Sequence, residues 1–131
     1  MTKLKGQCRC RAVTYAVDDA FAHALNFHCS NCRRTTGAGC NPFGGIALDR
    51  FHDVAGAQDL RRFGDGGDHD LHCAICGSVL YSAVRSSTYA DVALGTQVDA
   101  PAIRPTAHIF LGSKAPWHEI TDDLPHYAEF G

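Results

Sequence analysis

The sequence predicts a mainly β fold, made of several small antiparallel sheets around a structural zinc site of four cysteines. Three observations predict it: short runs of β-branched and aromatic residues, glycines and prolines between those runs, and two close cysteine pairs far apart in the chain. No segment has a convincing helical repeat of apolar residues. A chain of 131 residues with 45% apolar and 20% charged residues fits one globular unit, so we expect a single zinc-binding domain over 1–131.

The strand-like runs cover 12–17, 79–84, 89–94 and 107–111. Thirteen glycines and five prolines separate such runs into short pieces, which favours small antiparallel sheets joined by turns. The glycines and aspartates of 64–68 predict a mobile loop. The residues after Ala115 predict an extended tail over the sheets, with Trp117 as its buried anchor.

Charge and hydropathy narrow the classes of partner. The net charge of −2 gives no basic field for nucleic acid or anionic lipid, so neither is expected as a partner. No run approaches the roughly 20 apolar residues of a membrane span, and no apolar segment follows the first lysines as in a signal peptide. We therefore expect a cytoplasmic protein, in which clustered cysteines more often hold metal than form disulfides.

The first candidate metal site joins the two close pairs Cys8 and Cys10, and Cys73 and Cys76. The Cys-x-x-Cys pair followed by Gly77 has the form of a zinc knuckle, in which glycine supplies a positive φ. If the first pair lies on an extended segment, residues two apart project from the same face. Four thiolates fill the shell of a zinc ion and leave no open position, so we expect a structural ion there.

A second close pair, Cys29 and Cys32, is followed at 33–37 by threonines and a glycine that suggest a loop of hydrogen-bond donors. Two cysteines are an incomplete zinc shell. A metal at this pair needs a third ligand, and it would then keep an exchangeable position, as catalytic metals do.

Six motifs then make a family pattern visible: 6–10 (GQCRC), 28–38 (HCSNCRRTTGA), 73–78 (CAICGS), 95–96 (GT), 108–110 (HIF) and 113–117 (SKAPW). Over nearly its full length the chain resembles the glutathione-dependent formaldehyde-activating enzyme family, which also includes centromere protein V. The resemblance implies small antiparallel sheets around a structural zinc on Cys8, Cys10, Cys73 and Cys76. It also implies a second, catalytic zinc held by three cysteines.

Two of those three catalytic ligands correspond to Cys29 and Cys32, and the first corresponds to Phe27, which cannot bind a metal. Cys40 is a candidate substitute, with a small buried cysteine as the alternative. His28 is expected to face away from Cys29 on an extended segment, with a satisfied ring. His72 is either a supporting contact to the knuckle or a solvent-facing side chain.

The resemblance implies a zinc-dependent carbon-sulfur lyase that acts on the adduct of a thiol, such as glutathione, with a small aldehyde. Cys29 and Cys32 would then be catalytic, and Arg33, Arg34 or Lys114 would be candidates for binding substrate carboxylates. The alternative is a non-catalytic zinc-binding module whose second metal site is degenerate, because fold does not fix function. A third interpretation, a zinc ribbon that binds nucleic acid, lacks the basic surface.

Overall fold

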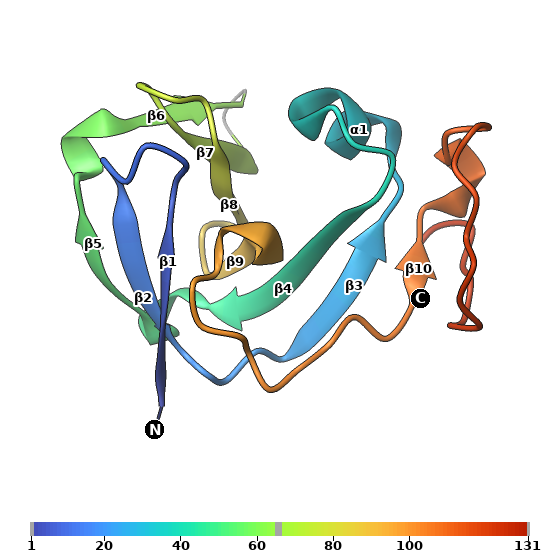
Figure 1. The fold of residues 1–131 in the computed structure, drawn as a ribbon, viewed down its shortest axis with the longest axis horizontal. Coiled ribbons are helices and arrows are strands. Elements are labelled where there is room, and N and C mark those ends of the chain that lie inside the picture. The colour runs from blue at the N-terminus through green and yellow to red at the C-terminus, as the bar shows by residue number, and fades with distance from the viewer. Residues whose placement is uncertain (1, 65–66, 131) are drawn as a thin grey trace.

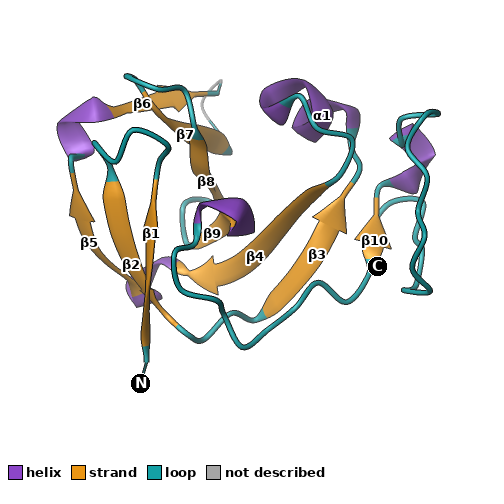
Figure 2. Ribbon diagram, viewed as in Figure 1, coloured by secondary structure: helices purple, strands orange, loops and turns teal. Residues whose placement is uncertain are grey.

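The computed structural model describes residues 2–64 and 67–130 and confirms the mainly β fold (Figures 1 and 2). Its smaller sheet has three antiparallel strands in the order β1-β2-β5. These strands are β1 (Lys3–Gln7), β2 (Thr14–Asp18) and β5 (Phe51–Ala55). The predicted loop at 64–68 includes residues 65 and 66, which lie outside the described residues.

The larger sheet has seven strands in the order β10-β3-β4-β9-β8-β7-β6. All its neighbours are antiparallel except β10 and β3, which run parallel. This parallel pair joins segments about 80 residues apart, so no short-range turn signal in the sequence predicts it. The strands are β3 (His23–Phe27), β4 (Asn41–Ala47), β6 (Leu60–Phe63), β7 (His69–Cys73), β8 (Val79–Val84), β9 (Tyr89–Ala93) and β10 (His108–Ile109).

The predicted strands agree with the structure to different degrees. The run at 79–84 coincides with β8, and the run at 89–94 exceeds β9 by one residue. The run at 107–111 keeps only two residues as β10, because Phe110 takes a left-handed conformation at φ 59° and begins a 3₁₀ turn.

The helices are short. The α-helix α1 (Ser30–Thr36) buries no residue, which is why no apolar repeat marks it in the sequence. The other helices are 3₁₀ turns: η1 (Leu48–Arg50), η2 (Ala57–Asp59), η3 (Leu94–Thr96) and η4 (Leu111–Ser113). None of the helices in the described part of the chain is long and apolar enough to cross a membrane.

The hydrophobic core lies between the two sheets and includes two of the predicted zinc ligands, Cys8 and Cys73. Phe51 connects the layers, since its ring stacks on Tyr15 at 5.2 Å and lies 4.6 Å from Tyr81. The other buried members of this cluster are Leu4, Val13, Val17, Ile46, Leu80, Ala90 and Val92.

The prediction that Trp117 anchors the tail in the core is wrong, because the side chain is 72% exposed. Ala115 is the fully buried residue of this turn. Gly39 lies under the rim of the indole, where a Cβ would come 2.9 Å from the ring. Trp117 therefore covers the buried Gly39 while its own ring stays exposed.

An ion-pair cluster joins β2 to η1 and β5. The buried carboxylate of Asp18 accepts from Arg50 at 3.2 Å and from His52 at 2.9 Å. Burial raises the pKa of Asp18, but the hydrogen bonds from Arg50 and His52 outweigh it, so the net pKa is lowered.

Candidate functional site

The predicted zinc ligands Cys8, Cys10, Cys73 and Cys76 come together at one end of the core. The Cys10 sulfur lies 3.7 Å from the sulfurs of both Cys8 and Cys73, and all four sulfurs lie within 4.8 Å of one another. A tetrahedral zinc with bonds of about 2.3 Å places its sulfurs roughly 3.8 Å apart. The cluster can hold a metal ion, and its geometry and donor atoms fit zinc.

The two halves of this cluster are both turns. Gly77 has φ 81°, as the knuckle predicted, and its N–H donates to the Cys73 carbonyl at 2.8 Å. Cys8 and Cys10 do not lie on an extended segment, so the condition for projection from one strand face is not met, because β1 ends at Gln7. A turn with Arg11 at φ 68° brings their sulfurs together instead.

Thiols of this cluster shift one another's pKa values, so that some are lowered and others raised. The Ser78 hydroxyl, 3.2 Å from the Cys76 sulfur, is the main reason that the pKa of Cys76 falls to about 5. At Cys10 a backbone hydrogen bond from Ala12 lowers the pKa, but desolvation and the neighbouring thiols raise it to about 12. A bound divalent cation would stabilise all four thiolates. His72 supports this turn, since its Nδ1 lies 3.2 Å from the Gly77 carbonyl oxygen.

The second pair, Cys29 and Cys32, is joined by a disulfide at the start of α1. The Cys29 sulfur caps the helix by accepting from the Cys32 N–H at 3.3 Å. The loop expected at 33–37 is the second half of this helix, which ends where Gly37 at φ 76° donates to the Arg33 carbonyl. Helix formation thus places both sulfurs on one turn.

The residues around this pair do not complete a three-ligand zinc shell. The ring of Phe27, at the position where the resemblance implies a first cysteine ligand, packs edge-on against Phe43 at 5.3 Å. Among the described residues, three groups of side chains could hold a metal ion, and none includes Cys29 or Cys32. Cys40, the candidate substitute, gathers instead with His28 and His118.

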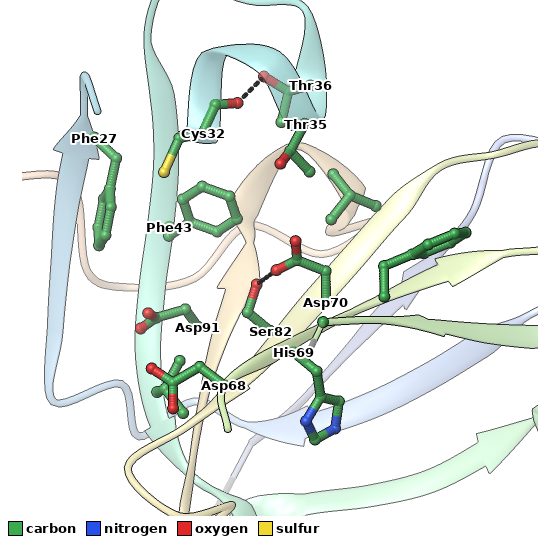
Figure 3. A pocket seen from close by; sticks show the side chains of 14 residues that line it. Phe27, Cys32, Thr35, Thr36, Phe43, Asp68, His69, Asp70, Ser82 and Asp91 are labelled. Carbon is green, nitrogen blue, oxygen red and sulfur yellow. Dashed lines mark hydrogen bonds between the residues drawn. The ribbon is translucent and has the colours of Figure 1, made fainter. Parts of the chain in front are cut away.

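A cavity of about 230 Å³ opens beside Cys32. Figure 3 shows its two unlike walls. One wall is formed by the Cys32 sulfur, two threonines and two aromatic rings, and the other carries carboxylates. Burial raises the pKa of Asp91 in the acidic wall, against the opposing charges of His23 and Arg85. The lining residues that matter below are Phe27, Cys32, Thr35, Thr36, Phe43, Asp68, Asp70, Ser82 and Asp91.

The basic residues considered as carboxylate ligands do not line this cavity in the described part of the chain. Arg33 and Arg34 occupy the last turn of α1. Lys114 lies at a different cavity, where its ammonium donates to the carbonyls of Ala115 and His118. The cavity beside Cys32 therefore favours cationic groups over carboxylates on its charged side.

His28 is completely buried on the other side of its segment. A second hollow is lined by Phe27, Cys29 and Cys32. His28 lines neither this hollow nor the cavity beside Cys32, so its side chain faces away from Cys29 as predicted. The prediction of a satisfied ring holds for one nitrogen. Nε2 lies 2.8 Å from His108 Nδ1, but Nδ1 has no hydrogen-bond partner among the described residues. Burial, followed by the charges of His108 and His118, lowers the pKa of His28 to about 4.

Comparison with known proteins agrees with these features. A crystal structure of a Rhodobacter sphaeroides protein is 28% identical, with a TM-score of 0.59 over 77% of this chain and 91% of that chain. A search of curated proteins found no match. The model of the family described as glutathione-dependent formaldehyde-activating enzyme matches residues 3–113, which include both Cys-x-x-Cys pairs. The chain therefore belongs to the glutathione-dependent formaldehyde-activating enzyme family.

Proposed function

We propose that the protein is a carbon-sulfur lyase-type enzyme that joins or separates a thiol, such as glutathione, and a small aldehyde. The observation that carries the proposal is the cavity beside Cys32, in a chain that belongs to this family. The wall that carries the Cys32 sulfur and the two aromatic rings suits a small aldehyde carbon. The acidic wall suits the ammonium group of a glutathione-like thiol. A cytoplasmic location, where such thiols are reduced, is part of the proposal.

The reaction needs one proton to move between sulfur and oxygen. In the forward direction the thiol loses its proton, its sulfur attacks the carbonyl carbon, and the new C–S bond forms as the oxygen takes up a proton. In the reverse direction the hydroxyl loses that proton and the C–S bond breaks. Asp91 is the proposed proton carrier, because burial raises its pKa and its carboxyl group faces the cavity (Figure 3).

The zinc dependence that we propose is structural. An ion on Cys73 would fix one end of β7, and the other end of the same strand contributes His69 and Asp70 to the cavity. Asp70 is in turn held by a hydrogen bond from the Ser82 hydroxyl of β8. Zinc bound to the four cysteines would therefore position the acidic wall without touching substrate.

The test is hemithioacetal exchange between glutathione and formaldehyde, followed by NMR magnetisation transfer on reduced, zinc-replete protein. We expect acceleration by the wild type and a loss on the order of a hundredfold in Asp91→Asn. Asp49→Asn, a carboxylate of η1 outside the cavity, is the matched control and should keep full activity. No acceleration by folded wild-type protein would exclude this activity.

The alternative function is a non-catalytic zinc-binding module with a degenerate second site. Phe27 and the disulfide of the second pair favour it, because neither leaves a complete metal shell there. The same exchange assay separates the two functions, since the alternative predicts a folded, zinc-loaded protein with no acceleration.

A further inference from the structure

Three side chains that can bind a metal ion come together, from distant parts of the chain, beside the C-terminal end of β3. His28 follows β3, Cys40 precedes β4, and His118 lies in the C-terminal segment beyond β10. Their ligand atoms all lie within 4.8 Å of one another, with His28 completely buried and the other two half-buried. We propose that His28, Cys40 and His118 form a second metal site that binds a zinc-class divalent cation.

This site lies on the opposite face of the sheet from the cavity beside Cys32. The His28 N–H donates to the Ile109 carbonyl at 3.1 Å, which continues the pairing of β3 with β10 by one residue. Successive side chains of an extended segment point to opposite faces. The Phe27 ring accordingly lines the cavity, and the His28 ring lies 5.4 Å from that of His118. The site is therefore separate from the disulfide pair.

A chain of hydrogen bonds determines which nitrogen of His28 is free. The Asp122 carboxylate accepts, so His108 Nε2, 2.9 Å away, must donate. The other nitrogen of a neutral His108 then accepts from His28 Nε2 at 2.8 Å. A neutral His28 is thereby left with a bare lone pair on Nδ1, the atom that is buried without a partner among the described residues.

A histidine that is ready to bind a metal has a free lone pair on one ring nitrogen, while a hydrogen bond at its other nitrogen fixes the ring. The buried His28 has this arrangement. Ligating histidines usually donate their second nitrogen to an oriented acceptor, which fixes the tautomer and the ring plane. His108 and Asp122 supply that support here. An empty Nδ1 would be costly to bury, and a metal–nitrogen bond removes that cost.

The backbone brings the other two ligands close to His28. Gly39 allows the loop before Cys40 to approach the C-terminal segment, since a Cβ there would lie 3.0 Å from His118 Nδ1. The His118 N–H donates to the Ala115 carbonyl at 3.0 Å, which fixes the turn that presents the imidazole. Local structure therefore holds two ligands in place around a buried third.

The donor set identifies the class of metal. Two imidazole nitrogens and one thiolate suit zinc and similar borderline cations, and three protein ligands leave a fourth position open. A cavity of about 490 Å³ lined by Lys114, Trp117, His118 and His126 gives access from solvent. A neighbouring group, His108 with Asp122 and His126, is a weaker candidate because both His108 nitrogens are already hydrogen-bonded.

The test counts zinc in a chain that lacks the disulfide pair. In the Cys29→Ser/Cys32→Ser background, dialysed against buffered zinc, we expect two zinc ions per chain by mass spectrometry. Adding Cys40→Ser or His118→Gln should lower the count to one, and the remaining ion on the four cysteines would report that the variant is folded. His126→Gln is the matched control and should keep two.

One zinc per chain in the background, or two retained in both ligand variants, would overturn the proposal. A second measurement covers a variant that fails to fold. Cobalt(II) added to the background chain already loaded with one zinc should give a single-thiolate charge-transfer band, and its absence counts against the site. Neither readout uses catalysis, so the result is independent of the function proposed above.

Discussion

Replacement of Cys76 by serine tests the cross-link between the two ends of the core. The metal cluster joins Cys10 to Cys73 across 63 residues of chain. In the chain-entropy treatment of cross-links, closing a loop of that length restricts the unfolded state by about 4 kcal/mol at 25 °C. Small domains have total stabilities of only about 5–15 kcal/mol. If Cys76→Ser releases the ion, the variant should therefore lose about a quarter or more of its stability.

The assay is urea unfolding followed by far-ultraviolet circular dichroism, with zinc content measured on the same samples. We expect Cys76→Ser to lose about 4 kcal/mol of unfolding free energy together with one zinc. Wild-type protein treated with a strong chelator should match it. Ile75→Ser is the control, because this side chain lies between the two knuckle cysteines and is 64% exposed. It should change stability by no more than about 0.5 kcal/mol.

The reasoning would be refuted by a Cys76→Ser chain that unfolds within about 1 kcal/mol of wild type after its zinc has gone. Equal stability of chelated and untreated wild type would be just as damaging. Either result would mean that the four thiols pack as an ordinary part of the core, and that no ion connects the turns.

Three further outcomes follow from individual residues. Phe27→Cys should add one zinc above the wild-type count, because it restores the missing thiol; an unchanged count under reducing conditions contradicts this. The same substitution should lower the free energy of unfolding by about 1–3 kcal/mol, because a half-buried ring is lost. Gly77→Ala should cost about 1–2 kcal/mol through strain at φ 81°, although nothing lies within 4 Å of the added Cβ. Gly95→Ala, equally open but without the positive φ, should be within about 0.5 kcal/mol of wild type in the same melt. Asp18→Asn should be less stable than wild type at pH 7, because it loses the charge that pairs with Arg50. The lowered pKa of Asp18 means that the stability difference between wild type and Asp18→Asn is present above about pH 4 and disappears as pH falls through the folded pKa. Urea midpoints of the two proteins that diverge further in acid would contradict this.

Local chemistry explains what the sequence predicts well. The cysteine pairs and Gly77 carry a turn and a ligand set within a few residues, so the four-cysteine cluster and its positive φ could be predicted from residue spacing alone. The run of β-branched and aromatic residues in β8 marks its bounds in the same way. These signals need no knowledge of distant neighbours.

Features that leave no apolar pattern, and features that depend on distant contacts, could not be predicted. Helix α1 is stabilised by the Cys29 cap and the Gly37 end, and it buries nothing, so it leaves no periodic pattern. The buried state of His28 depends on β10 and the C-terminal segment, about 80 residues away. The nearest sequence signal is the His-Ile-Phe motif at 108–110, which supplies the histidine partner but says nothing about its contact.

The most direct measurement is anomalous diffraction at the zinc absorption edge, from crystals of protein purified without chelator. The account predicts a strong peak at the centre of the four sulfurs of Cys8, Cys10, Cys73 and Cys76, about 2.3 Å from each. A folded chain with no anomalous density between those sulfurs would contradict it.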